Sequence, residues 1–117
     1  MQTRQIPRSE WPAFLNSFSS RHQGWLMNLE VFGPEIGAQV EGTALLLQGL
    51  TNERDEMNGN RITIMAGANA HNHLTHSITR PAEISLEQSN SGDDAVLSIK
   101  AEDGIRTLLT FPSAVLP

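Results

Sequence analysis

The chain lacks cysteine and tyrosine, holds a single lysine, and contains no long apolar run. Without cysteine, a disulfide framework, a zinc–thiolate centre and a thiol nucleophile are all excluded. No segment resembles a signal peptide or a membrane span, so we expect a cytoplasmic protein with no membrane partner. Eight basic residues are scattered through a chain of net charge −5, which argues against a nucleic-acid partner.

Large aromatic side chains are concentrated near the N-terminus. Both tryptophans, Trp11 and Trp25, and three of the four phenylalanines lie between residues 6 and 32. Aromatic residues bury the most surface per side chain, so we expect this stretch, both tryptophans included, to build the core. One face of a helix is predicted by apolar residues spaced at i, i+3, i+4 and i+7, namely Trp11, Phe14, Leu15 and Phe18.

Local signals predict where this helix begins and ends. Ser9 is a favourable N-cap residue, and Gly24 is suited to the left-handed conformation that terminates a helix. Arg21 and His22 place positive charge in the last turn, where the helix dipole favours it. These signals predict a helix over residues 9–23, preceded by a flexible polar tail at residues 1–5.

Residues 25–111 alternate between apolar and polar side chains, interrupted by Gly, Pro, Asn and Asp turns. No helical period follows residue 24, so there are no βαβ crossovers and the sheet must be antiparallel. The length suits one domain spanning residues 1–117. We predict an α+β, mostly β fold: one N-terminal helix packed on a small antiparallel, strongly bent sheet or partly open barrel of about seven strands.

Several short sequence blocks resemble an uncharacterised family of small bacterial proteins. In chain order the blocks are Ile6-Pro7-Arg8-Ser9-Glu10-Trp11, His22-Gln23-Gly24-Trp25-Leu26, Gly37-Ala38-Gln39, His73-Leu74-Thr75-His76-Ser77-Ile78, Pro81, Leu86-Glu87-Gln88 and Arg106-Thr107-Leu108-Leu109. The resemblance covers nearly the whole chain and implies one intact domain in a bacterial cytoplasm. It implies no activity and no catalytic residues.

Three of the four histidines, His71, His73 and His76, lie close together in the sequence. Imidazole ligates metals and titrates near neutrality, so a metal site and a general base are both open alternatives. However, His73 and His76 project from opposite faces of a continuous strand. We therefore expect no metal and no cofactor, with His76 buried or half-buried and satisfied by the backbone, and His71 and His73 exposed.

The strands carry a second set of apolar residues on the face opposite the predicted core, comprising Leu26, Phe32, Leu46 and Leu108. Residues 44–50 contain no charge and are a candidate sheet edge, which a second copy of the chain could cover. The leading hypothesis is a non-enzymatic interaction module: a homodimer that buries Leu46, or a binder of another protein. The alternative is a small-molecule-binding protein or enzyme, with a pocket between the helix and the barrel mouth that uses His76 and His22 as polar groups. The candidate binding residues are His22, Trp25, His73, His76 and Leu46.

Overall fold

The computed structural model describes residues 2–55, 59–69 and 72–111 of the chain. These residues form eight strands, one short 3₁₀ helix and one α-helix. In chain order the elements are β1 (Gln2–Ile6), η1 (Arg8–Glu10), α1 (Trp11–His22), β2 (Leu26–Gly33), β3 (Gly37–Asp55), β4 (Gly59–Asn69), β5 (Asn72–Thr79), β6 (Pro81–Gln88), β7 (Asp94–Ala101) and β8 (Arg106–Thr110).

None of the described helices has the length and hydropathy needed to cross a membrane.

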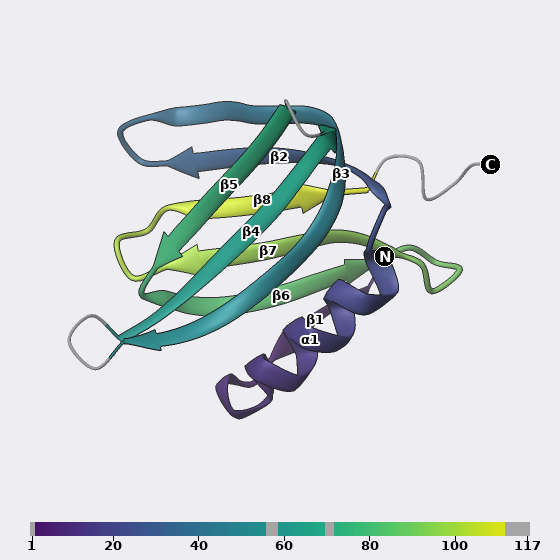
Figure 1. Cartoon of the computed structure of the whole chain (residues 1–117). Coiled ribbons are helices and arrows are strands. Elements are labelled where there is room, and N and C mark those ends of the chain that lie inside the picture. Colours follow the sequence, from purple (N-terminus) through teal and green to yellow (C-terminus); the bar gives the residue numbers. More distant parts are fainter. Residues whose placement is uncertain (1, 56–58, 70–71, 112–117) are drawn as a thin grey trace.

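All strand pairs are antiparallel, and the sheet order is β1-β6-β7-β8-β2-β3-β4-β5. The sheet is not closed, because β1 and β5 remain as its two edges. It bends so strongly that β3, β4 and β5 pass over β6, β7 and β8, with α1 along one side (Figure 1). The predicted mostly β fold with one N-terminal helix on a bent antiparallel sheet is confirmed, with eight strands instead of about seven.

The expectation of a flexible tail at residues 1–5 is wrong for residues 2–5, and residue 1 lies outside the described residues. Residues Gln2–Ile6 form β1, which pairs with β6 from Gln2 opposite Gln88 to Ile6 opposite Ile84. Only Ile6 of this strand is buried. The backbone hydrogen bonds that β6 offers along its open side therefore order a segment whose side chains carry almost no apolar signal.

The helix begins later than the capping signals indicate. Ser9 lies inside η1, where Glu10 donates its backbone N–H to the carbonyl of Pro7. Residue Glu10 is the N-cap of α1, and no side chain caps that end, so the assignment of Ser9 as the cap is wrong. The C-terminal end follows the expected logic, because Gly24 has a φ of +84° just beyond the helix.

Residues 44–50 belong to the long strand β3, which pairs with β4 from Leu46 onward. Leu45 and Leu46 also pair with β2, so this part lies inside the sheet and not at an edge as predicted. Beyond Leu47 no described strand pairs on the β2 side, where the helix residue Ser19 binds the Leu50 backbone. The register between β2 and β3 shifts near Ala44, which has a φ of +53° and donates its N–H to Oδ1 of Asn28. A β-bulge at this point lets β3 bend without interruption.

The core lies between the two layers of the bent sheet and under α1. The helix contributes its predicted apolar face, since Trp11, Phe14, Leu15 and Phe18 are all buried. The Ser19 hydroxyl fixes the helix to β3, because it donates to the carbonyl of Leu50 and accepts from its N–H. The prediction for Trp25 is wrong: this side chain is 39% exposed and lies at the surface.

Candidate interaction surface

Three large apolar side chains, Trp25, Leu26 and Leu46, are exposed where the helix passes into the sheet. Leu26 and Leu46 are paired across β2 and β3, and each is 38% exposed. Trp25 follows the helix at the adjacent end of the sheet. Its carbonyl accepts the N–H of the buried Leu47 and its ring packs on His22 and Phe111, so it belongs to the opposite face of the sheet. We call Leu26 and Leu46 the junction patch, with Trp25 at its border. It confirms that Leu46 projects away from the core, because its neighbours Leu45 and Leu47 are buried.

The junction patch continues across the outer face of the sheet toward the edge strand β5. Leu46 is opposite Gly67 in β4, and Gly67 is opposite His73 in β5, so these positions form one row with Leu26. His73 is exposed at the end of this row. Gly67, which has no side chain, is buried between Leu46 and His73. Two residues that sequence reasoning singled out separately thus share one surface.

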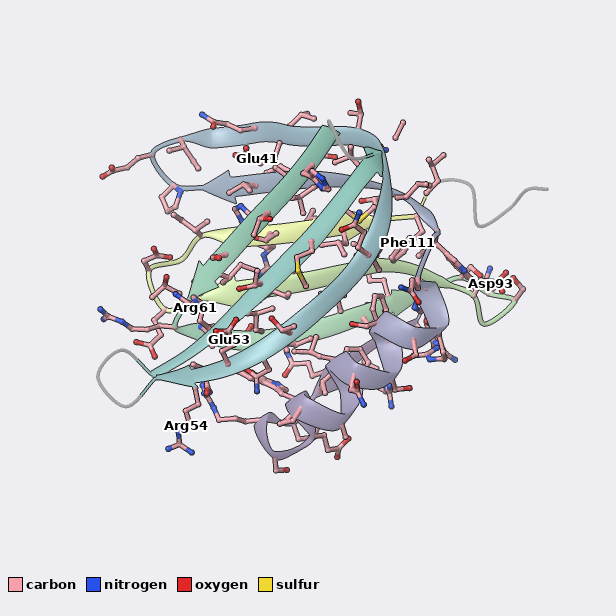
Figure 2. The ribbon with its side chains drawn as sticks, viewed as in Figure 1. Glu41, Glu53, Arg54, Arg61, Asp93 and Phe111 are labelled. Atoms are coloured by element: carbon pink, nitrogen blue, oxygen red, sulfur yellow. The ribbon has the colours of Figure 1, made fainter. Side chains whose placement is uncertain are left out.

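His22 lies beneath this surface and is buried. Its ring stacks on Phe18 and on Phe111, with centroid distances of 4.0 and 5.1 Å. The Trp25 ring meets the imidazole edge-on at 4.4 Å. Figure 2 shows Phe111 close to the C-terminal end of α1, where this cluster forms. The cluster therefore holds Trp25 in place at the surface.

Both ring nitrogens of His22 face oxygen atoms. Nδ1 lies 2.8 Å from the carbonyl oxygen of Phe18, and Nε2 lies 3.0 Å from Oδ2 of Asp94. The same carboxylate accepts hydrogen bonds from Arg21 at 3.0 Å and from Gln88 at 2.8 Å. Asp94 is buried, and it ties the end of α1 to the junction of β6 and β7. The sequence did not reveal this role, because Asp94 follows a Ser, Asn and Gly turn in which aspartate is ordinary.

Burial lowers the pKa of His22 below its ordinary value of 6.5. The Phe18 carbonyl and the Asp94 carboxylate favour the protonated ring and offset part of this effect, whereas the positive charge of Arg21 adds to it. The imidazole is therefore held in the helix–sheet contact by packing and by hydrogen bonds together.

His76 lies on the inner face of the sheet, in a row with the buried residues Leu50 and Ile64. It is half-buried, and its Nε2 is 3.4 Å from the Thr107 hydroxyl on β8. Its described hydrogen-bond partner is thus a side chain, not the backbone partner that we expected. Burial lowers the pKa of His76, and Glu41 offsets part of the shift.

The four histidines do not converge on one site. His73 and His76 lie on opposite faces of β5, His22 lies at the end of α1, and His71 is outside the described residues. In the described part of the chain, no group of three His, Asp or Glu side chains is placed to hold a metal ion. The absence of a metal from the whole protein stays a prediction.

A cavity of about 660 Å³ lies between the start of the helix and the ends of several strands. Neither His22 nor His76 lines this cavity, and Trp25 does not line it either. Its walls instead include arginine and asparagine residues that sequence reasoning did not single out. This cavity is therefore not the histidine-containing pocket that the alternative hypothesis describes.

These features define a small protein of one helix and an open antiparallel sheet, with an apolar patch at the junction of the two. The chain belongs to a family of unknown function (DUF5335), whose profile matches residues 2–115. An uncharacterised protein from Aquifex aeolicus (strain VF5) is 28% identical over 116 residues, which cover 98% of this chain and 96% of the relative. No solved structure matches the chain. The comparisons confirm the resemblance to an uncharacterised family, so the function must be argued from the geometry.

Proposed function

We propose that the protein is a non-enzymatic interaction module that forms a symmetric homodimer through the junction patch. The observation that supports this proposal most directly is the pairing of two exposed leucines, Leu26 and Leu46, on the outer face of the sheet, with the exposed Trp25 at the end of the same strand pair. Isolated exposed apolar residues are common on protein surfaces, whereas contiguous apolar groups are typical of binding sites. Tryptophan is also enriched among residues that dominate binding energy.

The composition around the patch is typical of a protein–protein interface, with an apolar centre and a polar margin. The centre is apolar, and the outward row ends in the polar side chain of His73. The Trp25 ring is supported from below by His22 and Phe111, so little conformational entropy is lost when a partner covers it. In a two-fold symmetric dimer the patch of one subunit packs against the same patch of the other, so apolar surface is buried against apolar surface.

The oligomeric state of three proteins tests this proposal. Sedimentation velocity at micromolar concentration should show the unaltered chain at twice its 12.8 kDa mass. Leu46→Glu should sediment as a monomer with an unchanged circular-dichroism spectrum, because the new carboxylate is solvated only when the patch is free. Val40→Glu is the matched control: Val40 lies on the same strand and is 62% exposed, but it is outside the patch.

An unaltered chain that remains monomeric at the highest soluble concentration would contradict the homodimer. Equal dissociation by Leu46→Glu and Val40→Glu would also contradict it, because the effect would then come from added charge and not from the patch. If Leu46→Glu unfolds the protein, Leu26→Gln provides a second test at the paired position in β2.

A further inference from the structure

Three of the seven arginines line the cavity at the start of the helix, and none of them forms an ion pair within the described residues. Arg8 comes from η1, Arg54 from the end of β3 and Arg80 from the corner between β5 and β6. Glu102 supplies the acidic side chain of the described lining. In a protein of net charge −5, this concentration of unpaired positive charge marks a place where an anion is stabilised.

Arg8 is held in position for such a ligand. Its guanidinium lies over the Trp11 ring, 4.5 Å from the centroid, and donates a long hydrogen bond of 3.4 Å to the Pro81 carbonyl. The Trp11 ring is itself fixed, because it is buried and its Nε1 donates to the Ile6 carbonyl at 2.9 Å. A guanidinium that is oriented before binding retains several N–H donors in a planar fork, which suits phosphate oxygens.

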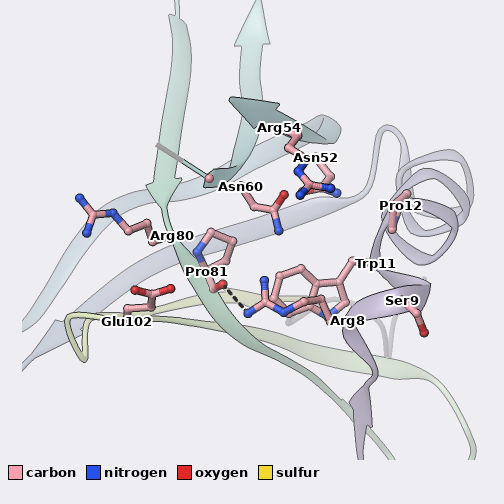
Figure 3. Close-up of a pocket in the computed structure, with 11 residues that line it drawn as sticks. Arg8, Ser9, Trp11, Pro12, Asn52, Arg54, Asn60, Arg80, Pro81 and Glu102 are labelled. Carbon is pink, nitrogen blue, oxygen red and sulfur yellow. Dashed lines mark hydrogen bonds between the residues drawn. The ribbon is translucent and has the colours of Figure 1, made fainter. Parts of the chain in front are cut away.

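Asn52 adds a second and independent sign of a ligand. Its Oδ1 atom is buried and has no hydrogen-bond partner among the described residues. A buried acceptor left without a donor destabilises the empty protein, and such an atom calls for an explanation. Figure 3 shows Asn52 on the same side of the cavity as Arg54, with Asn60 between them and Pro81. A ligand hydroxyl group donates the hydrogen bond that Oδ1 lacks once a rotation of the Asn52 amide brings this buried atom to the cavity surface.

The backbone at the rim of the cavity is also unusual. Arg80 has a φ of +53°, a conformation that is unfavourable for any residue other than glycine. It is retained by two hydrogen bonds: the Arg80 N–H donates to the Asn60 carbonyl, and the Arg80 carbonyl accepts from Glu102. Figure 3 shows Arg80 and Glu102 together, across the cavity from Asn52. Strained non-glycine residues of this kind concentrate at functional sites.

From these four features we infer that the cavity binds a small phosphate monoester that carries hydroxyl groups. Arg8 and Arg54 bind the phosphate, and Asn52 accepts a hydrogen bond from a hydroxyl of the carrier. A volume of about 660 Å³ lies within the range of small-molecule sites and accommodates a ligand of the size of a sugar phosphate. This site is separate from the junction patch, so the two proposals stand or fall independently.

Isothermal titration calorimetry with three probes tests the inference: ribose 5-phosphate, inorganic phosphate and ribose. Ribose 5-phosphate should bind with the highest affinity, inorganic phosphate more weakly, and ribose undetectably. Arg8→Gln and Arg54→Gln should each weaken ribose 5-phosphate binding by about tenfold or more, because each removes charge-assisted hydrogen bonds. Arg61→Gln is the matched control, since Arg61 pairs with Glu53 on the exposed surface, where Figure 2 labels both.

Asn52→Leu separates the role of the carrier from that of the phosphate. This variant should lose the preference for ribose 5-phosphate over inorganic phosphate while retaining phosphate binding. Three outcomes would overturn the inference: no binding of ribose 5-phosphate at millimolar concentration, equal weakening by Arg61→Gln, or unchanged binding by both Arg8→Gln and Arg54→Gln. Because Arg54 is exposed, its variant remains informative even if Arg8→Gln disturbs the packing on Trp11.

Discussion

Nε2 of His22 lies 3.0 Å from Oδ2 of Asp94, and this buried contact joins the end of α1 to the start of β7. The local sequence around each residue does not indicate this contact. It indicates only that His22 complements the helix dipole and that Asp94 follows a turn. The contact also supports the junction patch, since the His22 ring packs against Trp25.

The first prediction concerns this pair. Asp94→Ala should lower the free energy of unfolding by about 1–3 kcal/mol, because it leaves the buried His22 and the part-buried Gln88 without their acceptor, whereas water can solvate the half-exposed Arg21. Urea denaturation measures the change. Asp93→Ala is the control at the adjacent exposed position and should stay within about 0.5 kcal/mol of the unaltered chain. Equal effects at the two positions would contradict a specific role for Asp94.

The second prediction concerns pH. The folded-state pKa values of His22 and His76 are both lowered by burial, so the unfolded chain binds more protons than the folded chain below about 6.5. The free energy of unfolding should therefore fall as the pH decreases through 6.5 toward the lowered values. Above that window the two histidines should contribute no slope.

Urea denaturation at a series of pH values checks this sign. Replacing His22 with Gln removes one of the two groups, so the variant should lose part of the pH dependence between about pH 7.5 and 5.5. If the protein became more stable as the pH fell across this interval, the folded state would not lower the pKa values of the two histidines, and the prediction would be contradicted.

The third prediction concerns the helix face. Phe18→Ala should cost roughly 3–5 kcal/mol, because Phe18 is completely buried and packs against Phe14, His22 and Phe111. Chemical denaturation provides the measurement. Asn16→Ala changes an exposed position of the same helix and should have little effect. A loss below about 1 kcal/mol for Phe18→Ala would remove α1 from the centre of the fold.

Much of the fold could be predicted because its signals are local. The spacing of Trp11, Phe14, Leu15 and Phe18 identifies a helix face without any knowledge of the partner strands. The alternation of Leu45, Leu46 and Leu47 likewise predicts which side chain projects outward. Gly24 ends the helix through its own backbone conformation.

The features that the sequence did not predict depend on contacts between distant segments. Strand β1 forms because β6 offers an unpaired side, although residues 2–5 have polar side chains only. Trp25 is exposed because it lies just before the first residue of β2, at the end of the sheet. The alternation of apolar residues does not indicate where the sheet ends. The cavity at the start of the helix takes Arg8 from η1, Arg54 from the end of β3 and Arg80 from the corner between β5 and β6, so no spacing rule in the sequence relates them.

The exposure of Trp25 offers the most direct test of the homodimer, because Trp11 is buried and stays protected in either state. We would measure acrylamide quenching of tryptophan fluorescence in the unaltered chain, in Leu46→Glu and in Val40→Glu at the same micromolar concentration. The account predicts weak quenching for the unaltered chain and Val40→Glu, and stronger quenching for Leu46→Glu, in which the partner no longer covers Trp25. Equal quenching of all three proteins, each with an unchanged circular-dichroism spectrum, would contradict an interface at the junction patch.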